Sequence, residues 1–299
     1  MPELPDIVAY VEALEARITG STLRGIRIRS PFVLRSVEPA PDELAGRAVT
    51  RIGRIGKRIV IELAGERFIV LHLMIAGRLR WETAPPRTAS RQILALLDFD
   101  PGTLVMTEAG SKKRASIELI AGSDALAALD RGGIDPIASP AAAFTARLRS
   151  ENHTLKRALT DPRLFSGIGN AYSDEILHRA RLSPLQLTAR MPDDDVARLR
   201  EATVSVLTEW TDRLRAEAAG GFPEKVTAFR PGMAVHGKFG KPCPACGTPV
   251  QRIVYAENET NYCPTCQTGG RLLADRALSR LLHDDWPRSL DEMEERKKV

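Results

Sequence analysis

Hydrophobic positions near the N-terminus follow a helical spacing. Ile7, Val11, Leu14 and Ile18 recur at intervals of four, three and four residues, and Gly20 follows them as a stop signal. From about residue 22 to 120 the pattern changes to short apolar runs separated by Gly, Pro and charged residues. These runs cover 59–63, 68–73, 93–97, 104–106 and 117–120. The pattern predicts a helix that flanks a β-rich domain, which we interpret as a β-sandwich.

The second half of the chain is helical by pattern. Residues 121–145 are rich in Gly, Pro, Ala and Asp and are typical of a linker. A long helix is expected after Pro192, ending at Gly220-Gly221, with one apolar face formed by Val196, Leu199, Leu207, Trp210 and Leu214. A last helix is expected beyond about 271, with Leu272, Leu273, Leu278, Leu281 and Leu282.

Two cysteine pairs lie close together near the C-terminus. Cys243 and Cys246 form one C-x-x-C pair, Cys263 and Cys266 form another, and residues 247–262 separate them. Two such pairs offer four thiolates for a tetrahedral Zn²⁺ site. Because four thiolates fill the coordination shell, we expect one structural zinc, and an endonuclease with a catalytic metal is disfavoured. The intervening segment predicts a β-hairpin with an acidic tip at 257–259.

These elements together predict an α+β protein of several domains. We expect an N-terminal β-sandwich with a flanking helix over 1–130 and a helical domain over 143–221. A zinc-finger hairpin over 233–270 and a helical extension over 271–299 would follow.

Charge and hydropathy limit the classes of partner that this chain could have. The net charge is +5 and the pI is about 9.2, which fits a polyanionic partner without requiring one. No apolar run is long enough to span a membrane. The acidic, proline-bearing N-terminus does not resemble a secretory signal, so we expect a cytoplasmic protein. The default oligomeric state is a monomer.

A glycine-rich turn joins two helical patterns at 161–170. Gly167, Gly169 and Asn170 precede a helix N-terminus, where backbone N–H groups favour an anion. One reading is a phosphate clamp in which Lys156 and Asn170 are side-chain donors. The other is a helical hairpin whose glycines only form the turn.

The N-terminal residues offer a nucleophile. Removal of Met1 would leave Pro2 with a terminal secondary amine, and an α-amino group has a pKa of about 7.7–8.0. The neutral fraction could attack a sugar aldehyde carbon and form a Schiff base, with Glu3 beside it as an acid or base. Taken alone, these residues are also an ordinary start to a helix.

Together these segments resemble the formamidopyrimidine-DNA glycosylase/endonuclease VIII family. The resemblance covers residues 2–267 in the family's order. It rests on the N-terminal signature at 1–6, the strand lysine motif at 54–58, the intercalation segment at 72–77, the helix-two-turn-helix at 164–177, and the finger that begins at His236.

The resemblance implies a role for each matching position. Pro2 would attack C1′ of the damaged nucleotide, and Glu3 would be the acid/base at the sugar. Lys57 would contact phosphate and assist the chemistry, and Met74 would fill the space left by the extruded base. Lys156, Gly169 and Asn170 would hold backbone phosphates of double-stranded DNA.

Several positions depart from the family pattern. Asp6 stands where the family usually has glutamate, so the carboxylate is kept but is shorter. Asn258 aligns with the finger arginine, which puts the second elimination step in question. The wedge loop carries no aromatic residue, so Lys112, Lys113 and Arg114 are candidate substitutes. The chain between Gly221 and Met233 is shorter than in members that wrap 8-oxoguanine.

The resemblance therefore implies a bacterial base-excision repair glycosylase with AP lyase activity, associated with the nucleoid through DNA. The alternative is a protein that binds damaged or abasic DNA without cutting it. The lesion that is preferred is not readable from these residues.

Overall fold

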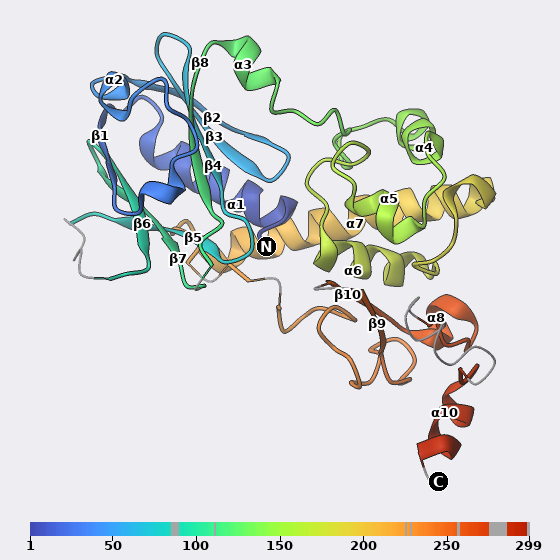
Figure 1. The fold of residues 1–299 in the computed structure, drawn as a ribbon. Coiled ribbons are helices and arrows are strands. Elements are labelled where there is room, and N and C mark those ends of the chain that lie inside the picture. Colours follow the sequence, from blue (N-terminus) through green and yellow to red (C-terminus); the bar gives the residue numbers. More distant parts are fainter. Residues whose placement is uncertain are drawn as a thin grey trace. The chain divides into compact units, whose positions relative to one another are not determined.

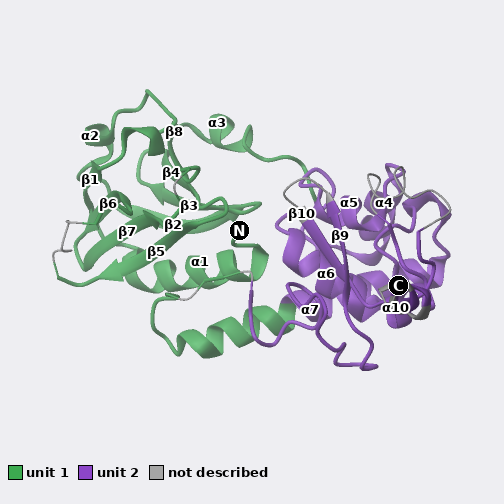
Figure 2. Ribbon diagram, turned by 60° about the horizontal axis from the view of Figure 1, so that its bottom comes forward, with its two compact units in different colours: residues 1–133, 208–228 green, residues 134–207, 229–299 purple. Residues whose placement is uncertain are grey.

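The chain folds into two compact units, shown in Figure 2. One unit contains residues 1–133 and 208–228, and the other contains 134–207 and 229–299. The computed structural model describes residues 1–84, 90–110, 112–224, 226–227, 229–255, 258–274 and 286–297. No helix among these residues has the length and apolar character needed to cross a bilayer.

The first unit is built from two antiparallel sheets (Figure 1). One sheet has the strand order β1-β6-β7-β5 and the other has the order β2-β3-β4-β8. The strands are β1 (Leu23–Ile28), β2 (Val49–Ile55), β3 (Arg58–Leu63), β4 (Arg67–His72), β5 (Gly77–Glu82), β6 (Ile93–Phe99), β7 (Gly102–Glu108) and β8 (Ser116–Ala121). The helices are α1 (Leu4–Ile18), η1 (Pro31–Val33), α2 (Pro41–Leu44) and α3 (Ser123–Ala127).

Helix α1 is anchored in the core of this unit. Ile7, Tyr10, Leu14 and Ile18 are completely buried, and they belong to one hydrophobic cluster with side chains from both sheets. Burying each such side chain stabilises the fold by about 1.5–3 kcal/mol. The flanking helix predicted from the apolar spacing is thereby confirmed. Its packing fixes the position of the residues that directly precede it.

The second unit is mainly helical and carries a small hairpin. Its helices are α4 (Ala141–Arg149), α5 (Leu155–Thr160), α6 (Asn170–Ala180), η2 (Thr188–Arg190), the first half of α7 (Asp193–Ala218), α8 (Pro264–Thr268) and α10 (Leu290–Lys297). Strands β9 (Gln251–Tyr255) and β10 (Asn258–Tyr262) form the hairpin. Phe144 of α4 and Phe165 pack against each other in the helical core, with ring centroids 4.8 Å apart and ring planes tilted by 41°.

The C-terminal extension differs from the sequence expectation. Leu272 and Leu273 are not helical; instead the Leu273 N–H donates to the Tyr262 hydroxyl at 2.7 Å, and the Leu272 N–H donates to the Arg288 carbonyl. The helix of this region that lies within the described residues is α10, and Leu278, Leu281 and Leu282 fall outside them. At Leu272 and Leu273, backbone hydrogen bonds to distant residues replace the expected helix.

The hairpin tip also differs. The register pairs Asn258 with Tyr255 and Glu259 with Val254, so both residues belong to β10 and not to the turn. Glu259 accepts from Arg252 at 3.0 Å across the hairpin. The acidic tip expected at 257–259 therefore loses one of its charges to an ion pair.

Candidate functional site

The N-terminal residues form a buried, ordered helix start. Pro2, Glu3 and Asp6 are buried, and the Glu3 N–H donates to the Asp6 carboxylate at 2.9 Å. Pro5 lies in the first turn of α1, where its missing N–H costs no hydrogen bond. Asp6 thus holds the backbone of Glu3 in place from inside the helix.

The terminal amine of Met1 lies among charged groups. Burial is the main cause that lowers the pKa of this amine below its usual value of 8.0. Arg78 and Lys57 act in the same direction, because a nearby positive charge disfavours the ammonium. Glu3 and Asp6 act in the opposite direction. Two carboxylates and two cations therefore act on the terminal amine.

Lys57 reaches this position from a tight hairpin turn. Gly56 and Lys57 connect β2 to β3, and Gly56 adopts φ 59°, in the left-handed region that this turn requires. The Lys57 side chain is half-buried. The strand lysine motif thus places a cation at the end of the hairpin that acts on the N-terminal amine.

His72, at the end of β4, is a neutral member of the same region. Burial lowers the pKa of His72 to about 4, and the charges of Arg58 and Lys57 add to the effect. The register places Arg58 directly opposite His72 on the neighbouring strand. A neutral imidazole therefore lies beside these cations at pH 7.

The turn between β4 and β5 presents an apolar tip. Met74 is only partly exposed and has φ 51°, whereas Ile75 exposes 51% of its surface. The turn is closed by a hydrogen bond from Gly77 N–H to the Leu73 carbonyl at 2.9 Å. A Cβ at Gly77 would lie 2.3 Å from that oxygen, so only glycine fits there. The structure brings Ile75 to the tip.

The loop after β7 is organised by a buried carboxylate. Glu108 is 1% exposed and accepts from the backbone N–H groups of Arg114 and Ala115 at 2.9 and 3.2 Å. Lys113 donates to the Glu108 carbonyl, while Lys112 and Arg114 are exposed. Of the three cations proposed as wedge substitutes, Lys112 and Arg114 are exposed to solvent, whereas Lys113 is bound to the protein backbone.

In the second unit the glycine-rich turn leads into α6 as predicted. Gly169 is the N-cap residue and Asn170 is the first residue of α6. The Asn170 amide donates to the Glu259 carbonyl of β10 at 2.8 Å. The turn and the finger hairpin are thereby tied together. The backbone of Asn258 starts β10, and its side chain lies outside the described part of the chain.

Lys156 lies in a buried ionic group. Its ammonium donates to Asp174 at 2.5 Å and to the Asn170 carbonyl at 2.8 Å, and its side chain is 13% exposed. The other Asp174 oxygen lies 2.8 Å from His236 Nδ1. A fully buried carboxylate needs such partners to offset its desolvation. Lys156 is therefore placed to fix the turn and the segment before the finger.

Glu175 joins helix α6 to the same segment. Its carboxylate accepts from the backbone N–H groups of Ala234, Val235 and His236 at 2.7–2.9 Å. Three such bonds hold the chain that leads into the finger. Neither Asp174 nor Glu175 was singled out in the sequence, although both lie one helical turn after Asn170.

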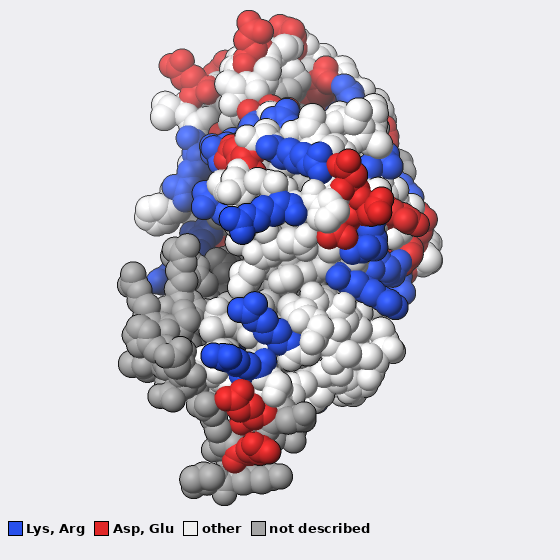
Figure 3. Space-filling model, turned by 90° about the vertical axis from the view of Figure 1, so that its right-hand side faces the viewer, with Lys and Arg blue, Asp and Glu red and all other residues white. Residues whose placement is uncertain are grey.

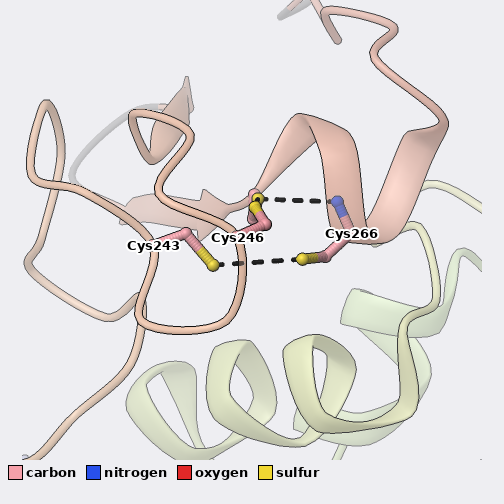
Figure 4. Close-up of side chains that lie close together, drawn as sticks. Cys243, Cys246 and Cys266 are labelled. Carbon is pink, nitrogen blue, oxygen red and sulfur yellow. Dashed lines mark hydrogen bonds between the residues drawn. The ribbon is translucent and has the colours of Figure 1, made fainter.

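The four cysteines converge on one site between a loop and α8. Figure 4 labels three of them, Cys243, Cys246 and Cys266. Their sulfur atoms all lie within 4.8 Å of one another, with Cys243 and Cys266 3.9 Å apart and Cys246 and Cys263 3.4 Å apart. Tetrahedral Zn–S bonds of about 2.3 Å require sulfur atoms about 3.8 Å apart. The geometry fits one structural Zn²⁺, as predicted. The His178 Nε2 lies 3.2 Å from the Cys243 sulfur and links α6 to the finger.

One face of the molecule carries side chains of both charges. Figure 3 shows one side of the molecule on which Lys and Arg side chains alternate with Asp and Glu side chains.

Comparison with known proteins matches three family models along the chain. The formamidopyrimidine-DNA glycosylase N-terminal domain matches residues 1–109, and the H2TH domain of the same enzymes matches residues 133–214. A zinc finger found in FPG and IleRS matches residues 240–269. The chain belongs to the formamidopyrimidine-DNA glycosylase family.

Individual relatives agree over most of the chain. Formamidopyrimidine-DNA glycosylase of Thermus thermophilus is 33% identical over 285 residues, which is 90% of this chain and 100% of the relative. The enzyme of Chloroflexus aurantiacus is 32% identical over 279 residues, which is 89% of this chain and 98% of the relative. A solved complex between Lactococcus lactis Fpg and DNA with an abasic site has a TM-score of 0.78 at 26% identity, covering 89% of this chain and 99% of that one.

Seven of the predicted site residues fall into two groups. Pro2, Glu3, Asp6 and Lys57 gather at the start of α1 in the first unit. Lys156, Gly169 and Asn170 gather at the start of α6 in the second. Sequence reasoning missed Arg78, His72 and Ile75. The available signal in the sequence was the placement of His72 and Arg78 on either side of the turn that Gly77 closes.

The low pKa of His72 predicts an acid-dependent loss of stability. The unfolded chain takes up a proton near pH 6.5, whereas the folded chain does so only near pH 4. Stability therefore falls as the pH drops through this window, by about 2 kcal/mol at pH 5. Urea unfolding at pH 5 and 7.5 should show this fall in the native sequence and a smaller fall in His72→Gln. Equal falls in both proteins would contradict the assignment.

Proposed function

We propose that this chain is a base-excision repair DNA glycosylase with AP lyase activity, and that the amine of Pro2 is its nucleophile. The observation that carries the proposal is the placement of the chain's first residues, buried beside Glu3, Asp6 and Lys57. Family membership supplies the reaction class. Since the relatives are bacterial, the nucleoid is the proposed place of action.

The first chemical steps require a neutral amine and an acid. The lone pair of the Pro2 nitrogen attacks C1′, and the damaged base leaves with the electron pair of its glycosidic bond. Glu3 takes the proton of the new ammonium and returns it to the ring oxygen O4′ as the C1′–O4′ bond breaks. The nitrogen lone pair then forms an iminium with C1′. The surroundings that lower the pKa of the Met1 amine favour the neutral nucleophile when Pro2 is the first residue.

Strand cleavage follows from the iminium. A base removes a proton from C2′, the electrons form the C2′=C3′ double bond, and the C3′–O bond breaks so that the phosphate leaves with its electron pair. Lys57 supports this step through the phosphate and through its charge next to the nucleophile. Asp6 is a positioning residue, because its carboxylate holds the Glu3 backbone.

The second unit would hold the DNA backbone. The N-terminus of α6, with Gly169 and Asn170, offers N–H groups and a positive dipole to a phosphate. We assign Lys156 a positioning part, since its ammonium is bound to Asp174 and to the Asn170 carbonyl. Asn170 would exchange its bond to Glu259 for a phosphate. The zinc ion stabilises the finger and takes no part in the reaction.

An extruded base leaves a gap that the protein must fill. Ile75 is the apolar side chain at the exposed tip of the β4–β5 turn, and we propose it as the residue that enters the gap. Met74 is partly buried in a backbone conformation that favours glycine. Lys112 and Arg114, exposed on the adjoining loop, would contact the bases or backbone around the gap.

Borohydride trapping tests the nucleophile. We compare two C-terminally tagged proteins on an abasic duplex: one whose mature chain starts at Pro2, confirmed by mass, and one with an added N-terminal extension. The extension converts the amine into an amide, which cannot form an imine. Trapping should fall by roughly a hundredfold or more.

Affinity for a duplex with a tetrahydrofuran abasic analogue is the control for that experiment. It should stay within a few-fold, measured by fluorescence anisotropy. If the extended protein is trapped as well as the free one, Pro2 is not the nucleophile. If the free protein binds the analogue tightly and is never trapped on abasic or oxidised-base duplexes, the chain recognises damage without cutting it.

The gap-filling residue is tested by truncation. Ile75→Ala should slow base removal from a damaged duplex by roughly tenfold, because the stacked helix closes again over the unfilled space. Met74→Gly removes the neighbouring side chain and suits its positive φ, so excision should stay within a few-fold. The rates are measured in single-turnover excision assays. A larger loss in Met74→Gly than in Ile75→Ala would return the role to Met74.

A further inference from the structure

Arg78 is a cation beside the N-terminal amine that the sequence motifs do not mark. It is the second residue of β5 and is half-buried. Its guanidinium, like the ammonium of Lys57, acts electrostatically on the amine of Met1. Arg80, two residues further along the strand, is exposed and lies 3.7 Å from Glu82.

The Arg78 side chain is held in place by the turn that precedes it. Its Nη1 donates to the Gly77 carbonyl at 2.7 Å and to the Ile75 carbonyl at 3.2 Å. Both hydrogen bonds that Arg78 donates within the described residues come from Nη1. The Nε and Nη2 donors therefore remain for another acceptor. A guanidinium with fixed geometry and free donors suits bidentate binding of a phosphate.

Helix α1 and strand β5 are tied together next to Arg78. The Leu79 N–H donates to the hydroxyl of Tyr10, a fully buried residue of α1, at 3.3 Å. Tyr10 lies two turns after Glu3 on the same helix. The strand that carries Arg78 and the helix that carries the nucleophile are thus parts of one rigid core.

The charge balance around the amine calls for two cations. Glu3 and Asp6 are buried carboxylates, so a phosphate that enters beside them meets like charge. Lys57 alone balances one of them. Arg78 is a second cation that acts on the amine, and it offsets the other carboxylate when an anion approaches.

We propose that Arg78 is a catalytic residue that binds, together with Lys57, the phosphate on the 3′ side of the damaged nucleotide. This inference rests on the proposed function. When the C3′–O bond breaks, the C2′ proton has gone to a base and the phosphate leaves with the bonding electrons. The phosphodiester, with one negative charge, becomes a monoester that gains another. Arg78 stabilises that added charge through its Nε and Nη2 donors.

The test compares Arg78→Gln with Arg80→Gln on duplexes with a preformed abasic site. Arg80→Gln removes the same charge from the same strand, but Arg80 is not among the charges that act on the amine. At saturating DNA, Arg78→Gln should nick the strand roughly ten to a hundredfold more slowly. Arg80→Gln should stay within a few-fold of the native rate.

The pH profile of borohydride trapping separates a catalytic role from a structural one. Arg78 lowers the pKa of the terminal amine, so its loss should move the midpoint of trapping to higher pH. A residue that only braces the turn would leave that midpoint unchanged. Native nicking and an unshifted profile in Arg78→Gln would overturn the inference.

A variant that does not fold and a native protein that is not trapped are the two remaining outcomes. If Arg78→Gln does not fold, Arg78→Lys replaces it: the lysine keeps the charge but loses the bidentate fork. Its trapping midpoint should stay native while nicking falls, and native nicking would overturn the inference. If the native protein itself is never trapped, the proposed function fails. If the native protein is trapped and Arg78→Gln behaves as Arg80→Gln, only the role of Arg78 fails.

Discussion

The burial of helix α1 in the core of the first unit determines where the chemistry can occur. Ile7, Tyr10, Leu14 and Ile18 lock the helix against both sheets, so the residues before it cannot move independently. Asp6 closes the first turn onto Glu3, and the turn between β2 and β3 brings Lys57 to the same place. A chain terminus, normally among the most mobile parts of a protein, is here held in a fixed electrostatic setting. This is what a terminal amine needs to act as a nucleophile.

In the second unit, buried polar groups join helices α5 and α6 to the segment before the finger. Asp174 links Lys156 to His236, and Glu175 binds three consecutive backbone N–H groups ahead of the finger. Removing one partner of such a group leaves a buried charge unpaired, which costs more than the pair itself contributes. The glycine-rich turn before α6, the segment before the finger and the zinc site thus form one connected structure. Four thiolates on zinc supply roughly 10–16 kcal/mol of apparent folding free energy to it.

The sequence predicted the parts of the fold whose signal is local. Apolar spacing identified α1 and α7, and cysteine spacing identified the zinc site, because each depends on neighbours within one element. Strands β1, β2 and β5 were not among the apolar runs, since arginines alternate with their apolar residues, as in Arg24 and Arg27. Alternation with a period of two runs through β5, whereas a register shift interrupts it in β1 and β2. Leu272 and Leu273 differ from the expected helix because their backbone N–H groups bond to the Arg288 carbonyl and the Tyr262 hydroxyl, and local spacing does not show such contacts.

The candidate site was predictable as a set of positions and less so as a set of roles. The resemblance named Lys156 as a phosphate donor, but only three-dimensional packing reveals that Asp174 holds its ammonium. Likewise, Met74 and Ile75 are adjacent apolar residues, and only the positive φ of Met74 and the exposure of Ile75 distinguish them. Arg78 lies in no motif, and its relation to the amine depends on how β5 packs against α1.

The most direct measurement is the site of attachment of the sugar. The borohydride-reduced adduct with an abasic duplex is digested with nuclease and protease, and the modified peptide is sequenced by tandem mass spectrometry. The account predicts a peptide that begins at Pro2 and carries the sugar remnant on its first nitrogen. A remnant on the side chain of Lys57 or another lysine, with the Pro2 nitrogen unmodified, would contradict it.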